Sequence, residues 1–497
     1  MEINNILTLE QLKPKLNRLF QLSGQKILAI EETWDSKQGT PVFTAKGKYT
    51  TRGWTEWTQG FQFGSALLQF DATGNSQFLD IARKSIIEKM ATHVSHIGVH
   101  DHGFNNISTY GNLRRLILER LIERNDWEIH FCEMALKASA AVQASRWTSI
   151  NNGKGYIYSF NGPHSLFSDT MRSLRVLGIG HQLGHVLMGE GDREISLLKR
   201  LIHHSETNAK YNVYYGEERD RYDVRGRVVH ESIFNINDGN YRCPSTQQGY
   251  SPFTTWTRGL AWVITGYAEQ LEFFDTLSDK DLQPFGDRLK VSSHMIRAAK
   301  ATADFYIKNT PIDGIPYWDT GAPGLSQLGD YLDQSSDPFN NYEPIDSSAA
   351  AITGQGLVRL GKYLQDHNEI ELGVAYYQAG LTIADTLLES PYLSESENHQ
   401  GLLLHSIYHH PNGWDYCPKN YKIPCGESSM WGDYHLREFA LLLMRLSENK
   451  PYSETNLFRK QTLVQKQTFV PKPFFRINPW NQFFFSETSE QLNAIYN

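Results

Sequence analysis

"SQFLDIARKSIIEKM", residues 76–90, repeats apolar side chains at intervals of three and four residues. On an α-helix that spacing places one stripe of residues on the same side: Phe78, Leu79, Ala82, Ile86 and Met90. Ser76 is positioned to cap the first turn. The stretch therefore predicts an amphipathic helix whose apolar stripe faces a core.

The same pattern recurs along most of the chain. It is found in "NLRRLILERLIER", "DWEIHFCEMALKASAAVQA", "TTWTRGLAWVITGYAEQLEFF", "LKVSSHMIRAAKATADFYIK", "SSAAAITGQGLVRLGKYLQ", "ELGVAYYQAGLTIADTLLE" and "WGDYHLREFALLLMRL". Strand signals are weak, and the best is "RGRVVHESIF", whose alternation suits a hairpin arm. We therefore expect an all-α fold with minor β-hairpin arms, built from about a dozen helices in stacked hairpins.

Composition limits the class of protein. The 497 residues are 40% hydrophobic and 12% aromatic, with a formal charge of −7. Because acids and bases are mixed along the chain, it lacks the basic stripe of a nucleic-acid binder. No window approaches the roughly 20 apolar residues of a membrane helix, and the N-terminus lacks the features of a secretory signal. These patterns predict a cytoplasmic protein with no nucleic-acid or membrane partner.

Domain boundaries are few. No Pro- or Ser-rich linker interrupts the helical series, so residues 1–449 are expected to form one domain. A polar, Tyr-rich insertion at residues 206–229 is expected to be a long surface loop. The extension 450–497 contains "KPFFRINPWNQFFF", and we expect its rings to pack on the domain or on a second subunit of a homo-oligomer. The four sparse cysteines predict free thiols rather than a disulfide framework.

Aromatic, glycine and carboxylate residues gather where the predicted helices begin. The stretches are "WTEWTQGF", "HDHGF", "FSDTM", "QQGYSPFTTWTRGLAW", "YWDTGAPG", "PIDSSAAA" and "SSMWGDYH". If the helices form concentric hairpins, these positions converge on one face. A cleft lined by rings and polar groups suits a sugar, whose hydroxyls need hydrogen bonds and whose apolar faces stack.

In order and rough spacing, these motifs resemble the unsaturated glucuronyl hydrolases, glycoside hydrolase family 88. The resemblance runs from about Trp54 to Leu446. It implies an (α/α)6 barrel and an enzyme that needs no cofactor. Its substrate would be a small oligosaccharide bearing the 4,5-unsaturated uronic acid that a polysaccharide lyase leaves. The enzyme would remove this sugar by hydrating its C4=C5 double bond.

The resemblance also implies the catalytic residues. Asp169 of "FSDTM" matches the general acid and base, which gives a proton to C4 and takes one from water. Asp101 of "HDHGF" matches a second aspartate that would position the sugar. Two carboxylates in one site do not ionise together easily, so one of their pKa values is expected to rise.

The resemblance also implies a set of substrate-binding residues. His230 and Gln248 would orient water or the sugar, and Arg258 would grip the uronate carboxylate with its planar fork. The other matches are the rings of Trp57, Trp256 and Trp262, the serines Ser428 and Ser429, and Phe160, which stands where relatives often have tryptophan. Thr257 and Leu260 also depart from the family, so the reaction carries over more securely than the exact substrate.

Structural interpretations compete with these roles. Asp169 could be an ordinary helix N-cap, and Trp262 could be a core ring. His100 and His102 flank Asp101 and suggest a metal site, but zinc-type sites need three or four ligands, usually spread over the fold. We therefore expect no metal there and assign both histidines to supporting or solvent-facing positions.

Three other functions are compatible with parts of this pattern. An unsaturated rhamnogalacturonyl hydrolase would share the barrel and the chemistry, but "DSSAAAI" and "RGLAW" fit that family less well. A sugar 2-epimerase would use histidine pairs for proton transfer, whereas this chain offers an aspartate pair. A non-catalytic carbohydrate-binding barrel would have no need of Asp169 and Arg258, and both are present.

Overall fold

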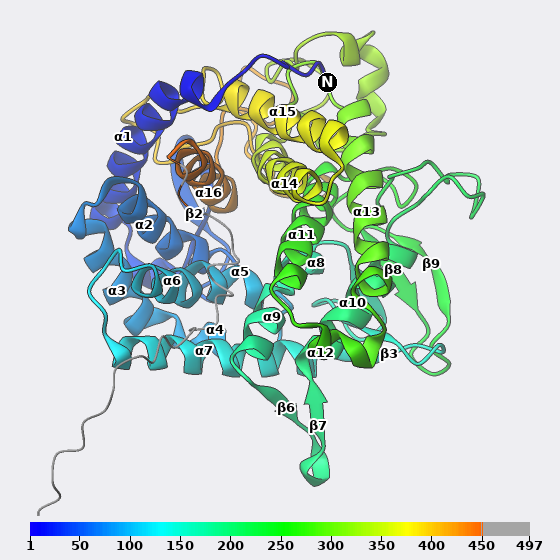
Figure 1. The fold of residues 1–497 in the computed structure, drawn as a ribbon. Helices are drawn as coiled ribbons and strands as arrows, with labels where there is room; N and C mark the ends of the chain where they lie inside the picture. The colour runs from blue at the N-terminus through cyan, green and yellow to red at the C-terminus, as the bar shows by residue number, and fades with distance from the viewer. Residues whose placement is uncertain (449, 451–497) are drawn as a thin grey trace, which may run out of the picture. The chain divides into compact units, whose positions relative to one another are not determined.

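Long helices alternate between an outer and an inner layer along the chain (Figure 1). The computed structural model describes residues 1–448 and Lys450. The outer helices are α1 (Leu9–Thr33), α3 (Ser76–Lys89), α7 (Asp126–Ser145), α10 (Leu197–Tyr211), α13 (Arg288–Lys308) and α15 (Ile370–Leu387). The inner layer is made by α2 (Gln59–Thr73), α5 (His102–Asn106) with α6 (Asn112–Leu118), α8 (Thr170–Ser173) with α9 (Arg175–Gln182), α11 (Thr257–Asp275), α14 (Ser347–Asp366) and α16 (Met430–Ser447).

Burial separates the two layers. Helices α11 and α14 are buried on nearly every side, as expected of helices enclosed by others. Helix α3 buries the predicted stripe together with Ser85, and its opposite side is exposed. Its cap differs from the prediction: Asn75 accepts the N–H of Gln77, and Ser76 is the first helical residue. The predicted (α/α)6 arrangement of concentric hairpins is confirmed.

Short elements join the long helices. The small helices α4 (Ala91–Val94) and α12 (Asp279–Leu282) lie in connections. Antiparallel hairpins are formed by β1 (Pro41–Ala45) with β2 (Lys48–Thr51), β3 (Trp147–Ser149) with β4 (Gly155–Ile157), and β6 (Val186–Met188) with β7 (Glu194–Ser196). A three-stranded sheet has the order β5 (Ser165–Phe167), β8 (Glu231–Phe234), β9 (Tyr241–Ser245). The arm predicted from "RGRVVHESIF" is therefore present as β8.

The Tyr-rich insertion begins later than predicted. Helix α10 continues to Tyr211, so the stretch assigned to a loop at residues 206–229 starts inside a helix. The buried polar side chains of Thr207 and Asn208 explain the error, because they resemble surface residues in the sequence while they face the interior. The remaining loop is closed by the bridge between Val213 and Val228.

Two further predictions concern the ends and the chemistry of the chain. The aromatic extension 450–497 lies outside the described residues except for Lys450. All four cysteines are free thiols.

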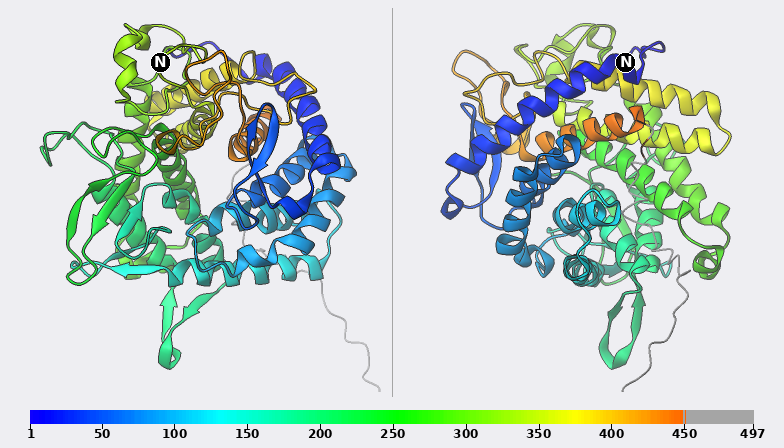
Figure 2. Two further views of the ribbon diagram at one scale, coloured as in Figure 1. Left: turned by 180° about the vertical axis from the view of Figure 1, so that it is seen from behind. Right: turned by 60° about the vertical axis from the view of Figure 1, so that its left-hand side comes forward.

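Among the described helices, none is both long and apolar enough to cross a membrane. Figure 2 shows the helical layers from two further directions.

Candidate active site

The starts of four inner helices converge on one cavity of about 430 Å³. Its walls come from the segments before α2, α5, α8 and α11 and from the loop before α16. The lining includes these predicted residues: Trp57, Asp101, Phe160, Asp169, Gln248, Trp256, Arg258 and Trp262. The expected convergence of helix starts is therefore observed for most of the motifs.

His100 lies between the two predicted catalytic aspartates. Its Nε2 is 3.4 Å from Oδ1 of Asp169 and 3.7 Å from Oδ1 of Asp101. All three side chains are nearly inaccessible to solvent. Both ring nitrogens of His100 and Oδ1 of Asp169 lack an ordinary hydrogen bond. The three groups thus form a close ionisable cluster with unused hydrogen-bonding capacity.

The surroundings shift the pKa values of the two carboxyl groups in opposite directions. Burial, together with the charge of Asp169, raises the pKa of Asp101, although His100 opposes the shift. Burial also acts to raise the pKa of Asp169, but His100 and His230 outweigh it and leave that pKa lowered. Burial disfavours the His100 cation, yet the two aspartates raise its pKa. The expected split therefore occurs, and Asp101 rather than Asp169 has the raised pKa.

Glycine packing brings these motifs together. A Cβ on Gly103 would lie 2.0 Å from the carbonyl oxygen of Ser173, so only glycine permits this approach of α5 to the end of α8. The N–H of Gly103 donates to Oγ of Ser173, which in turn donates to the carbonyl of His100. This contact fixes the "HDHG" segment against the segment that begins with Asp169.

The small sheet aligns Asp169 with His230. Phe167 at the end of β5 pairs with Glu231 at the start of β8, and the N–H of Ser168 donates to the carbonyl of His230. The next residue along from Ser168 is Asp169, whose side chain makes no capping hydrogen bond to α8. Asp169 therefore stands at the N-cap position of α8, as the structural interpretation expects, but its carboxylate is not used to cap the helix.

Two neutral histidines present unused donors. Nδ1 of His230 accepts the N–H of Gln247, which leaves the proton on Nε2, and that buried atom has no partner. Nε2 of His409 accepts from Asn412 at 3.4 Å, and its buried Nδ1 also has no partner. Burial lowers the pKa of both imidazoles to about 4. Both rings are thus neutral near pH 7, and His409 lines the cavity, whereas His230 lies next to the lining residue Trp256.

Arg258 differs from the prediction. Its Nη1 donates to Oδ2 of Asp346 at 2.8 Å and to the carbonyl of Ile407, and its Nη2 donates to the carbonyl of Tyr408 at 2.6 Å and to Oε1 of Gln248 at 3.1 Å. A guanidinium has only five N–H donors. The bidentate grip on a uronate carboxylate is therefore not supported, because the donors it needs are already engaged. Arg258 instead orients Gln248.

Aromatic rings form the apolar part of the cavity. Trp57 stacks on Trp431 at 5.1 Å, and Phe104 joins Trp57 to Trp262. Trp256 meets the ring of His230 edge to face at 4.8 Å. Trp262 is 2% exposed and is a core ring that also closes the cavity. Phe160 is 54% exposed and stacks over His100, so it offers a free ring at the entrance.

The predicted serines do not line this cavity. Oγ of Ser428 donates to the carbonyl of Leu403, and Oγ of Ser429 accepts the N–H of Gly432 as the N-cap of α16. Both residues are fully buried. Their predicted contact with substrate is not supported, because their hydroxyls hold the chain around α16.

The second histidine of "HDHGF", His102, has a structural role. Nδ1 of His102 contacts Oγ of Ser139, and its Nε2 contacts the carbonyl of His96, both at 2.9 Å. With both nitrogens engaged, His102 cannot join His100 as a metal ligand unless these bonds break. His102 therefore supports the fold, whereas His100 belongs to the ionisable cluster with Asp101 and Asp169.

Sequence reasoning missed several lining residues. Glu56 lies in the wall, and burial and the charge of Asp101 raise its pKa to about 7. Tyr408, His409 and Trp414 come from the loop before α16. Their stretch, "YHHPNGWDY", is rich in rings and histidines. The stretch does not lie at a helix start, so the pattern of helix starts does not predict its place in the site.

Comparisons with known proteins agree with this architecture. The chain is 24% identical over 417 residues to an unsaturated glucuronyl hydrolase from Bacillus sp. (strain GL1), covering 81% of the chain and 90% of that protein. It is 24% identical over 391 residues to one from Formosa agariphila, covering 77% and 78%. The crystal structure of an unsaturated glucuronyl hydrolase specific for heparin superposes with a TM-score of 0.65 at 19% identity, covering 88% of this chain and 98% of that one.

No protein-family model matches the chain. The resemblance predicted from the motifs is nevertheless confirmed by these relatives in sequence, and the helical barrel is confirmed by the solved structure.

Proposed function

We propose that the chain is a glycoside hydrolase that removes a terminal 4,5-unsaturated uronic acid from lyase-generated oligosaccharides. The observation that carries the proposal is the cluster of Asp101, His100 and Asp169 in a ring-lined cavity. The names of the relatives favour this activity over the rhamnogalacturonyl alternative. A carbohydrate-binding barrel without turnover would have no use for two buried carboxyl groups that share a histidine.

The reaction needs one group that gives and then takes a proton. Asp169, when protonated, transfers its proton to C4, and the C4=C5 electrons form the new C–H bond. Water adds to C5 and returns a proton to Asp169, so the carboxyl is restored. The resulting hemiketal is unstable; it opens and releases the rest of the oligosaccharide. Asp169 is 8% exposed and lines the cavity, which suits a group that must reach substrate while excluding bulk water.

The lowered pKa of Asp169 means that another group has to supply the proton. His100, whose pKa is raised, lies 3.4 Å from Asp169 and can hold the proton before substrate arrives. A bound uronate adds a negative charge near Asp169, and a like charge raises the pKa of a carboxyl group. Substrate binding thus favours movement of the proton from His100 to Asp169.

Substrate contacts are assigned to neutral groups. The Nε2 proton of His230 and the Nδ1 proton of His409 are free to donate to sugar oxygens, and Gln248 is held by Arg258. Phe160 and Trp57 provide faces for stacking. A cytoplasmic location and a homo-oligomeric state stay predictions.

The test uses unsaturated disaccharides prepared with polysaccharide lyases and follows loss of the double bond by ultraviolet absorbance. Asp169→Asn keeps the shape of the side chain and removes proton transfer, a contribution of typically 10²–10⁴-fold. We expect kcat to fall by that factor while calorimetry still detects disaccharide binding. Asp80→Asn, an exposed aspartate on α3, is the matched control and should be unchanged. Near-normal turnover by the Asp169 variant would remove that residue from the role.

A further inference from the structure

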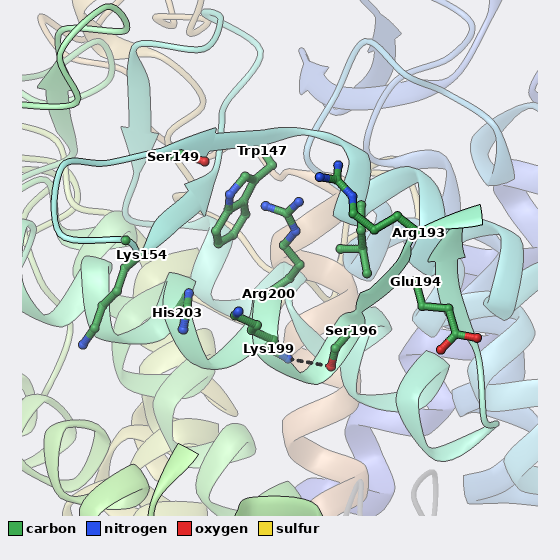
Figure 3. Close-up of a pocket in the computed structure, with 11 residues that line it drawn as sticks. Trp147, Ser149, Lys154, Arg193, Glu194, Ser196, Lys199, Arg200 and His203 are labelled. Atoms are coloured by element: carbon green, nitrogen blue, oxygen red, sulfur yellow. Dashed lines mark hydrogen bonds between the residues drawn. The ribbon is translucent and has the colours of Figure 1, made fainter. Parts of the chain in front are cut away.

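A second cavity of about 430 Å³ lies on the outer layer, away from the catalytic cluster (Figure 3). It is bounded by the β3–β4 hairpin, the strand β7 and the first turns of α10. The β6–β7 hairpin, which forms one side, projects from the helical layers in Figure 1. None of its lining residues is shared with the candidate active site.

Basic side chains dominate this cavity. Its lining contains Lys154, Arg193, Lys199 and Arg200 but only one acid, Glu194. Lys154 is paired with Glu206 at 2.9 Å. Within residues 1–448, by contrast, no carboxylate lies within ion-pair distance of the other three cations. The cavity therefore concentrates positive charge that the described part of the chain does not neutralise.

Two of these cations lie at an electrostatically unfavourable position on a helix. Lys199 and Arg200 lie in the first turns of the 15-residue helix α10, which Ser196 caps. The N-terminus of a helix carries partial positive charge and favours anions over cations. Basic residues at this end repel the helix dipole, and a bound anion would relieve that repulsion.

The lowered pKa values of two groups at the cavity are consistent with a positive electrostatic potential there. Burial, followed by the charges of Lys199, Lys154 and Arg200, lowers the pKa of His203 to about 4. Burial and the charge of Arg193 lower the pKa of Arg200 to about 10. The guanidinium of Arg200 lies 3.9 Å from the ring centroid of Trp147, which holds it in place beside the cavity. This cationic group is therefore positioned before any ligand binds.

We propose that this cavity is an anion-binding site for a phosphate or sulfate group, either free or carried on a sugar. Arg193, Lys199 and Arg200 would contact the oxyanion, because tetrahedral oxyanions accept hydrogen bonds from several cations at once. The exposed hydroxyl of Ser149 on β3 also lines the cavity and can donate. The proposal does not depend on the reaction at the catalytic cluster.

The test measures thermal stabilisation and calorimetric binding of the full chain at constant ionic strength. The probes are inorganic phosphate, inorganic sulfate and a saturated sulfated disaccharide, each compared with chloride. The variant is Arg193→Ala combined with Lys199→Ala, since both side chains are exposed and their loss leaves the core intact. Lys37→Ala combined with Lys84→Ala removes two other exposed cations and is the matched control.

We expect at least one probe to stabilise the protein more than chloride does. The double variant should bind that probe at least tenfold more weakly, because one charged hydrogen bond is worth about a factor of ten. The control should bind it normally. Binding of phosphate or sulfate identifies a free oxyanion as sufficient, whereas binding of the disaccharide alone identifies a sugar-borne group. Equal affinity in the double variant and the control, or no probe that exceeds chloride, would overturn the proposal.

Discussion

Replacing Arg258 by lysine separates a structural role from a role in charge recognition. Arg258 is 1% exposed and joins Asp346 to two carbonyl groups and to Gln248. A lysine ammonium presents its donors from a single atom, so it cannot span acceptors that two separate nitrogens now reach. We expect Arg258→Lys to keep the contact with Asp346 and to lose at least two of the other hydrogen bonds.

The magnitude follows from those lost contacts. A hydrogen bond to a charged group contributes about 1.5–3 kcal/mol, so two of them amount to about 3 kcal/mol at the lower limit. Typical domains have only about 5–15 kcal/mol of total stability. The assay is urea unfolding followed by tryptophan fluorescence. Arg242→Lys, which alters an exposed pair with Asp238, is the control and should change stability by less than about 0.5 kcal/mol.

Kinetics give the decisive comparison. Because all four Nη hydrogens of Arg258 are engaged by other protein groups, its loss should lower kcat/KM equally for the free-acid substrate and for its methyl ester. A urea midpoint equal to that of the wild type, together with a loss confined to the free acid, would refute this reasoning. It would show that Arg258 turns from Asp346 to grip the uronate.

Three other perturbations test the site. Glu56→Gln should remove a rise in KM that the wild type shows above about pH 7, where this cavity carboxyl ionises and repels an anionic substrate; a wild-type KM that is flat across that range would contradict the raised pKa. Prolonged chelation should leave turnover unchanged, because His102 is held by structural hydrogen bonds; activity that returns only with added zinc or manganese would show that a metal acts. Ser429→Ala should destabilise the fold by about 1 kcal/mol through loss of the α16 cap and leave KM unchanged, whereas a raised KM at wild-type stability would restore its predicted contact with substrate.

The carboxyl pKa values also predict how stability depends on pH. The pKa of Glu56 is raised in the folded protein, so folded Glu56 retains a proton that the unfolded chain has released. Its contribution therefore makes the fold less stable as pH rises from about 4.5 to about 7. The pKa of Asp169 is lowered, so its contribution is present above the unfolded pKa and is lost as pH falls through the lower folded value.

The local sequence pattern was sufficient to predict the helices and the convergence of motifs at their starts. The stripe of residues 76–90 is buried as predicted, since helical periodicity depends on neighbours three and four residues apart. The motifs at the starts of α2, α5, α8 and α11 converge because alternating hairpins of similar length return the chain to the same end of the barrel. Asp101, Asp169, Trp57 and Trp256 could therefore be placed in one cavity from sequence.

The tertiary structure alone decided how charges are paired. Arg258 meets Asp346, 88 residues away, and the carbonyl of Ile407, 149 residues away; no local pattern encodes such contacts. The same holds for His100, whose position between Asp101 and Asp169 helps decide which of the two carboxyl groups has the raised pKa. The chemistry of a buried ionisable group depends on every charge and dipole that folding brings around it. Sequence thus determined which residues at the helix starts enter the site, and packing determined which loop residues join them, which groups carry protons and which remain free to bind.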